Sequence, residues 1–242
     1  MPAYCLRPLA ATLLLLALTS VRLSAAEPVA GDVSADLATI SGTVTYIADP
    51  KRPWRYSRYY VKSRKDGALA EAVVCLKGRS LKGYAKSEKP GQHKVDQENF
   101  RFVPETLAIR AGDTVLFTNS DGAVHNVMTG DGIDPFNVNM AQGGRHEVLF
   151  RRAGGTRRPI RIGCVFHSAM RCWVYVFDHP FFAVTGEDGT FRFAGVPPGE
   201  YELQMVHPAG DLVWSRDVTL TAGGQLEVDI PVSPDQLEKG TR

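Results

Sequence analysis

The chain has 242 residues, of which 44% are hydrophobic and 22% charged, with 28 Lys and Arg residues against 26 Asp and Glu residues. These fractions are typical of a globular protein and exclude a disordered or fibrous one. The first 26 residues hold two arginines and no acid, so the rest of the chain is close to neutral. Its charge therefore gives no argument for nucleic-acid binding.

The N-terminal segment predicts export. Arg7 precedes an apolar run at Leu9–Leu18, and Ser24-Ala25-Ala26 supplies the small residues at which a signal peptidase cuts. A run of about ten apolar residues is typical of a Sec-type signal peptide and is too short to span a bilayer, which takes ~20. No later segment is long and apolar enough to cross a membrane. We therefore expect residues 1–26 to be a signal peptide and the mature protein to be periplasmic or otherwise exported.

The remaining sequence predicts an all-β fold. Helical periodicity is nearly absent, and short alternating or apolar runs are bounded by Gly, Pro, Asn and Asp, as in antiparallel β-structure. Turn motifs such as Ala111-Gly112-Asp113 and Glu187-Asp188-Gly189 separate these runs. We interpret the pattern as two small β-sandwiches. The expected strands are 41–47, 72–77, 100–103, 107–110, 114–118, 146–150, 160–164, 173–177, 191–193, 201–206, 213–220 and 225–230.

The two ends of the chain resemble the two halves of one domain. Gly42-Thr43-Val44 followed by Ala72-Val73-Val74 is similar to the opening of a carboxypeptidase-regulatory, or transthyretin-like, sandwich. The closing half of that family resembles the stretch 185–191, the turn Val196-Pro197-Pro198-Gly199 and the strand Tyr201-Glu202-Leu203. The resemblance implies that a different domain is inserted in the middle of this sandwich.

One short motif predicts metal chemistry. Cys164, His167 and Met170 stand three residues apart. A thiolate, an imidazole and a thioether together suit copper better than other common biological metals, whereas structural zinc sites rarely use methionine. The set still needs one strong ligand. His125 is the obvious candidate, because it follows an expected strand and a glycine turn.

This part of the sequence resembles the cupredoxins, the type 1 (blue) copper proteins. The similarity extends from Phe100 to about Phe177, and the spacing Cys164-x2-His167-x2-Met170 is similar to that of amicyanin. It implies a Greek-key cupredoxin sandwich over residues 93–178, with residues 27–92 and 179–242 as the two parts of the regulatory-like sandwich. The whole arrangement resembles the exported cupredoxin proteins often labelled methylamine-utilisation proteins. The other marks of the cupredoxin resemblance are Phe102-Val103-Pro104, Ala111-Gly112-Asp113-Thr114-Val115, Asn119 and His125-Asn126-Val127.

The resemblance also implies a set of ligands for one type 1 copper ion. His125, Cys164 and His167 would be the strong ligands and Met170 the weak axial one, while Asn126 would tie the two ligand loops together from the second shell. Four occupied positions leave none for a substrate. The expected function is therefore single-electron transfer between redox partners, and not an enzymatic reaction.

Two other functions remain open at this point. The chain could be a periplasmic copper-binding or delivery protein whose site exchanges its metal. It could also be a metal-free adhesion or carbohydrate-binding β-sandwich with a degenerate copper motif. The sequence does not identify a redox partner.

The remaining cysteines have two interpretations. Cys75 and Cys172 could form a disulfide that links the two sandwiches. Alternatively, Cys172 could stay buried as a small hydrophobic residue. The other histidines are expected to be surface or packing residues and not ligands: His93 in a loop, His146 at the start of a strand, and His179 and His207, each before a proline.

The segment 51–65 is strongly basic, with seven Lys and Arg residues and no acid. It could be a solvated loop between the first two strands. It could also dock on an acidic redox partner or make peripheral contact with an anionic membrane, since electrostatic attraction speeds encounter.

Overall fold

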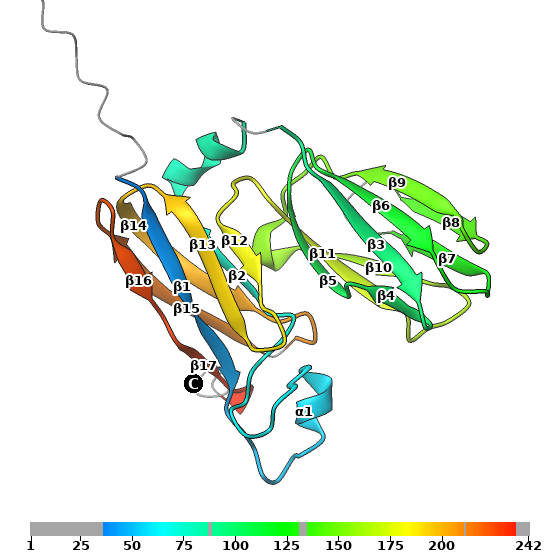
Figure 1. Ribbon diagram of the computed structural model, residues 1–242, viewed down its shortest axis with the longest axis horizontal. Helices are drawn as coiled ribbons and strands as arrows, with labels where there is room; N and C mark the ends of the chain where they lie inside the picture. The colour runs from blue at the N-terminus through cyan, green and yellow to red at the C-terminus, as the bar shows by residue number, and fades with distance from the viewer. Residues whose placement is uncertain (1–35, 87–88, 131–134, 211, 236–242) are drawn as a thin grey trace, which may run out of the picture. The chain divides into compact units, whose positions relative to one another are not determined.

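The computed structural model describes residues 36–86, 89–130, 135–210 and 212–235 (Figure 1). Strands dominate the described residues and the helices among them are short, so the fold is all-β, as predicted. The expected signal peptide lies outside the described residues. No helix among the described residues is both long enough and apolar enough to span a membrane.

The middle of the chain forms one sandwich, which we call the inner sandwich (Figure 1). Its first sheet has the strand order β4-β3-β6-β9 and its second sheet the order β5-β11-β10-β7-β8. The strands of the first sheet are β3 (Gln92–Glu98), β4 (Arg101–Val103), β6 (Thr114–Asn119) and β9 (Arg145–Leu149). Those of the second are β5 (Thr106–Arg110), β7 (His125–Thr129), β8 (Phe136–Met140), β10 (Ile160–Gly163) and β11 (Arg171–Phe177).

The alternation of side chains along the strands explains why the two sheets pack face to face. Val115, Phe117 and Asn119 of β6 point inward and are buried, while their neighbours along the strand are only half-buried. The pairs β3–β6 and β5–β11 are parallel, and the other pairs in the inner sandwich are antiparallel. Parallel neighbours cannot be joined by a hairpin. The chain therefore crosses between the two sheets, as the predicted Greek key requires.

The outer sandwich combines segments from both ends of the chain. Its strands β1 and β2 precede the inner sandwich, and β12 to β17 follow it (Figure 1). The chain thus begins one sandwich, forms the other, and returns to complete the first. One sheet contains β1 (Ala38–Tyr46), β13 (Thr190–Val196), β16 (Gln225–Glu227) and β17 (Ile230–Val232). The other contains β2 (Val73–Lys77), β12 (Phe182–Val184), β14 (Gly199–Val206) and β15 (Val213–Leu220).

The described helices are short. They are the α-helix α1 (Arg55–Arg58) and the 3-10 helices η1 (Arg79–Lys86) and η2 (Gly155–Arg157). Each lies in a connection between strands, so none of them contributes a layer to the fold.

The structure differs from the expected strands at several places. The strands β3, β7, β8 and β12 were not predicted, and the last expected strand is divided into β16 and β17, which both pair with β1. His93 lies in β3 and not in a loop. This strand buries only Val95 and Gln97, and because one of the two is polar, the hydrophobic alternation of a half-buried strand is hidden.

The disulfide that the sequence left open is not formed. Cys75 and Cys172 are both free and buried. They belong to different clusters: Cys75 packs with Tyr175 and Phe177, whereas Cys172 lies in the core of the inner sandwich. Burial raises the pKa of both thiols, that of Cys75 to about 12, so little of either is the reactive thiolate. Cys172 is the small buried hydrophobic residue of the second alternative.

Candidate metal centre

Three potential metal ligands come together where β7 and β10 are neighbours. His125 is the first residue of β7, Cys164 follows the last residue of β10, and His167 lies in the connection to β11. The two strands are joined by the pair Gly163 and Met128. The ligand atoms of His125, Cys164 and His167 all lie within 4.8 Å of one another. Sheet pairing therefore brings together two motifs that are about 40 residues apart in the sequence.

The distances within this group fit a metal ion. The Nδ1 atoms of His125 and His167 are 3.1 Å apart, and the sulfur of Cys164 is 3.6 Å from Nδ1 of His167. Metal–nitrogen bonds of about 2.0 Å and metal–thiolate bonds of about 2.3 Å would give separations of this size. Two imidazoles and one thiolate are also the strong donors of a blue copper site. The residues present thus fit a copper ion in both spacing and chemistry.

The three side chains differ in their access to solvent. His125 is fully buried and Cys164 is 6% exposed, whereas His167 is only half-buried. Water is therefore kept away from two of the donors. His167 is the residue of the group that solvent reaches.

Met170 lies in the same buried cluster as Cys164. Its side chain is almost completely buried, and its backbone amide donates a hydrogen bond of 2.9 Å to the carbonyl of His167. This bond closes a tight turn, so the segment from Cys164 to Met170 is compact. The sequence-predicted axial ligand therefore belongs to the same loop core as the thiol.

Asn126 links the strand of His125 to the loop of Cys164. Its backbone amide donates to the sulfur of Cys164 at 3.3 Å, and its side-chain oxygen accepts from the amide of Val165 at 3.4 Å. Its side-chain amide donates to the side chains of Asn137 and Asn139 on β8. These bonds fix the sulfur and the next residue of the ligand loop to β7.

Sequence reasoning missed two residues of this group. They are Asp121, in the turn before His125, and Phe100, the first residue of an expected strand. An Asp121 side-chain oxygen lies 2.7 Å from Nε2 of His125. Burial opposes ionisation of this carboxyl, but hydrogen bonds from the Phe100 amide and the His125 ring outweigh it and hold the pKa of Asp121 below its usual value. The available signal was the acid four residues before the candidate ligand.

The ring of Phe100 contacts both histidines edge-to-face. Its centroid is 5.2 Å from that of His125 and 4.9 Å from that of His167, at interplanar angles of 90° and 87°. Phe100 is also 52% exposed. It therefore covers the two rings while presenting its other face to solvent.

Large exposed hydrophobic residues flank the ligands in the sequence. Besides Phe100, they are Val124 before His125, and Val165 and Phe166 between Cys164 and His167. Their exposures are between 52% and 53%. We call these four residues the apolar rim. Exposed apolar patches of this kind mark contact sites on soluble proteins.

The other histidines do not join the group. His93 lies 3.1 Å from a carboxylate oxygen of Asp113, and the ring of His146 packs against Phe136. His179 and His207 are buried in hydrogen-bonded positions. All four therefore have local packing or hydrogen-bonding partners, in agreement with the sequence expectation for them.

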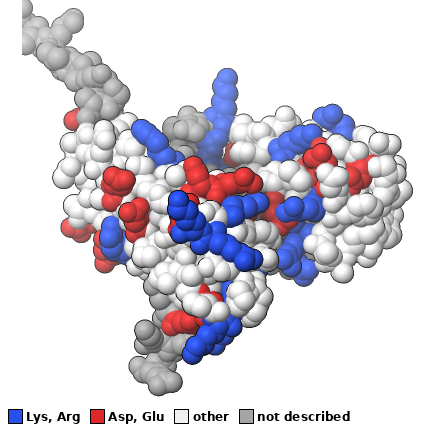
Figure 2. Space-filling view, turned by 60° about the horizontal axis from the view of Figure 1, so that its bottom comes forward, with Lys and Arg blue, Asp and Glu red and all other residues white. Residues whose placement is uncertain are grey.

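The basic segment 51–65 is partly neutralised by acids outside it. Arg52 and Arg55 both pair with Asp49 and Asp235, at 3.1–3.4 Å. Lys62 pairs with Glu187 at 3.2 Å. Figure 2 shows basic and acidic side chains interspersed on the visible face. These pairs reduce the net charge that the segment would offer to a partner.

Comparison with known families gives two matches, one in the middle of the chain and one in its C-terminal part. Residues 90–161 match the copper binding proteins of the plastocyanin/azurin family, and residues 174–233 match the carboxypeptidase regulatory-like domain. His125 lies within the first match. Cys164, His167 and Met170 lie between the two matched ranges. The chain matches none of the curated proteins with which it was compared.

Similar solved structures include copper proteins. An amicyanin from Paracoccus versutus is 26% identical, with a TM-score of 0.32, over 39% of this chain and 89% of the amicyanin. An amicyanin mutant in its Cu(I) form is 21% identical, with a TM-score of 0.33, over 44% and 99%. A copper-containing nitrite reductase from Thermus scotoductus is 24% identical, with a TM-score of 0.33, over 39% of this chain but only 24% of its own length.

The fold and the family matches together define an all-β protein with a cupredoxin domain. More specifically, the chain combines a copper-binding domain of the plastocyanin/azurin type with a carboxypeptidase regulatory-like domain. Both resemblances found in the sequence, to the cupredoxins and to the carboxypeptidase-regulatory sandwich, are therefore confirmed.

Proposed function

We propose that this chain is an exported type 1 copper protein that transfers single electrons between redox partners. The observation that supports the proposal is the convergence of His125, Cys164 and His167, whose ligand atoms lie within 4.8 Å of one another. They lie in the inner sandwich, of which residues 90–161 match a copper-binding family. Export rests on the signal peptide that the sequence predicts.

A copper ion with two imidazoles, one thiolate and a weak thioether changes its geometry little between Cu(I) and Cu(II), which makes electron exchange fast. The chain would hold the ion with His125, Cys164 and His167, and Met170 would be the axial ligand. The Asn126 amide would keep the thiolate oriented. With these four positions filled, no site remains for a substrate, which favours a carrier over an enzyme.

The half-buried ligand His167 offers the route for the electron. His167 is the least buried of the three strong ligands. Val165 and Phe166 of the apolar rim precede it directly in its loop, and the ring of Phe100 contacts its ring. A redox partner that packs on this rim would approach the ligand ring closely and exclude water from the contact. We therefore expect the partner to bring an apolar patch of its own to this surface.

The test is a visible absorption and EPR spectrum of the mature protein after one equivalent of Cu(II). An intense thiolate-to-copper band is expected, and it should be lost in Cys164→Ser. Cys75→Ala is the matched control, because Cys75 is also a free buried thiol but lies in the outer sandwich. The control should keep the band.

Two results would contradict the proposal. A pale spectrum, typical of nitrogen and oxygen ligands, would mean that Cys164 does not bind copper. A strong band combined with rapid loss of copper to a chelator would favour the delivery protein. The carrier requires slow copper loss and reversible one-electron reduction.

A further inference from the structure

One carboxylate organises the surroundings of both histidines. Asp121 accepts hydrogen bonds from the backbone amides of Asn99 at 2.7 Å and Phe100 at 2.9 Å, and its Oδ2 lies 2.7 Å from Nε2 of His125. The amide of Asp121 in turn donates to the side chain of Asn119 at 2.9 Å. The carboxylate is thus fixed between the turn at residues 99–100 and a metal-ligand candidate.

The turn that Asp121 holds has an unusual backbone. Asn99 and Phe100 have φ values of 53° and 58°, which lie in the left-handed region that residues other than glycine rarely adopt. Both amides point to the same carboxylate in this conformation. The turn thereby places the ring of Phe100 edge-to-face against His125 and His167.

The contact between Asp121 and His125 selects one tautomer of the imidazole ring. An ionised carboxylate accepts, so Nε2 donates and holds the proton. The lone pair of Nδ1 is then free, and Nδ1 is the atom that lies 3.1 Å from Nδ1 of His167. A carboxylate on the remote nitrogen also makes an imidazole a stronger donor to a metal.

We propose that Asp121 is a positioning residue that fixes the tautomer and orientation of His125, holds Phe100 over both ligand rings, and lowers the reduction potential of the copper site. This inference rests on the proposed function. The lower potential follows because a more basic imidazole and a nearby negative charge stabilise Cu(II) more than Cu(I). A carboxylate that only tethered the turn would change the potential no more than another buried carboxylate of the same sandwich does.

The test is Asp121→Asn in the copper-loaded protein. Loss of such a partner weakens metal binding by roughly 10–100-fold, and we expect this loss mainly for Cu(II). Each tenfold loss that Cu(I) does not share would raise the reduction potential by about 59 mV. Cu(II) affinity is measured by competition with a chelator, and the potential by voltammetry.

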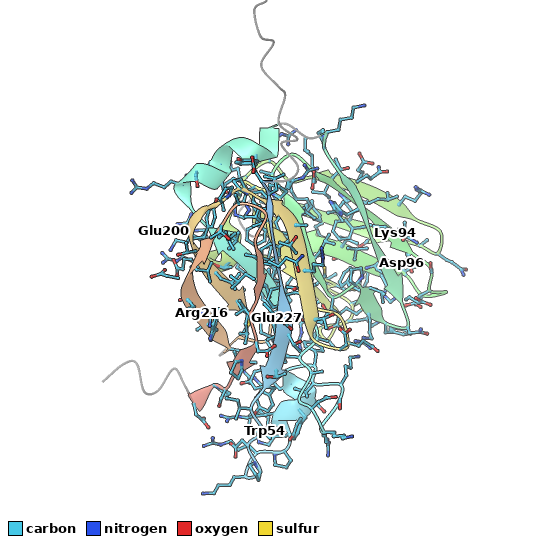
Figure 3. The ribbon with its side chains drawn as sticks, turned by 60° about the vertical axis from the view of Figure 1, so that its left-hand side comes forward. Trp54, Lys94, Asp96, Glu200, Arg216 and Glu227 are labelled. Atoms are coloured by element: carbon cyan, nitrogen blue, oxygen red, sulfur yellow. The ribbon has the colours of Figure 1, made fainter. Side chains whose placement is uncertain are left out.

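Asp96→Asn is the matched control. Asp96 lies on β3 of the same sandwich, where Figure 3 labels it beside Lys94. Its side chain is 15% exposed, against 13% for Asp121, and it accepts hydrogen bonds from Thr118 and Ser120. Removing this charge should also affect stability, but it should leave the potential close to that of the parent. Equal potentials for the two variants would overturn the inference.

A second measurement needs no variant. In the reduced, diamagnetic protein, the His125 Nε2 proton should give a low-field NMR signal that exchanges slowly with solvent. Its absence would overturn the inference even if Asp121→Asn fails to fold. A parent protein without the thiolate-to-copper band would instead overturn the proposed function, and the inference with it.

Discussion

The backbone amide of Asn126 points at the sulfur of Cys164, 3.3 Å away, while the side chain of the same residue accepts from the amide of Val165. One residue of β7 therefore holds two consecutive residues of the ligand loop. The sulfur contact does not depend on the side chain of Asn126, but the bond to Val165 does. A substitution can separate the two effects.

Asn126→Ala should loosen the ligand loop without removing a ligand. Its buried side-chain hydrogen bonds would be lost, at a cost of about 1–3 kcal/mol in the free energy of unfolding. We expect a lower melting temperature and faster copper loss to a chelator, with the thiolate-to-copper band still present. Asn139→Ala is the control, since Asn139 is exposed and makes only one of these bonds. Identical copper-loss rates for both variants would contradict the role given to Asn126.

A charge on the apolar rim should slow electron exchange and leave the copper site intact. Val165→Asp would place an unpaired carboxylate in the contact, and a penalty of ~1.4 kcal/mol there corresponds to a tenfold slower reaction. The electron self-exchange rate, measured by NMR line broadening, tests this. Val213→Asp is the control, because Val213 is a similarly exposed valine of the outer sandwich. Slowing by both variants alike would show that net charge, and not the rim, controls exchange.

The sequence predicted the all-β fold and both sandwiches, because alternation and turn residues are local signals. The inner sandwich also has strands that depend on partners far along the chain. β3 is held by its parallel pairing with β6, and Val95 is buried in the core that it shares with residues of the facing sheet. Gln97 of the same strand is buried as well. A polar residue in a core position gives no hydrophobic pattern from which this strand could be predicted.

The candidate site shows the same limit. The sequence predicted His125 as well as Cys164 and His167, and the structure brings these three side chains together. Asp121 and Phe100 were missed because their contacts with the histidines depend on the backbone of residues 99–100. Similarly, the sequence shows the cations of the basic segment but not that Arg55 pairs with Asp235, about 180 residues away. Long-range pairing of this kind is absent from local sequence patterns.

Stability should fall in mild acid because of His207. Burial lowers the pKa of this side chain to about 4, from 6.5 in the unfolded chain. Its Nε2 donates to the carbonyl of Ala70, and its Nδ1 accepts from the amide of Ala209. A proton on Nδ1 would therefore face the N–H of Ala209, and this hydrogen bond would be lost. The unfolded chain thus binds the proton first, and stability is lost as pH falls from 6.5 towards 4. The shift corresponds to on the order of 3 kcal/mol.

Urea unfolding at several pH values between 7 and 4 measures this effect. His207→Gln should be less stable at pH 7 but should lose less stability across the window. His179, whose pKa is also lowered by burial, contributes in the same direction and would remain in that variant. A parent protein equally stable at pH 7 and pH 4 would contradict the assignment.

Gly42, part of the opening motif of the regulatory-like sandwich, has a steric role that the sequence did not reveal. A Cβ atom at this position would lie 1.9 Å from the carbonyl oxygen of Val228, which is backbone and cannot move aside as a flexible side chain could. Gly42→Ala should therefore separate β1 from the chain at Val228, at a cost of about 1–3 kcal/mol, as in other overpacked sites. Thermal unfolding measures the loss.

Gly130→Ala is the control, since no atom lies within 4 Å of a Cβ there. Because Gly42 belongs to the outer sandwich, the copper spectrum should be unchanged below the transition. A Gly42→Ala protein as stable as the control would mean that β1 can shift at no cost.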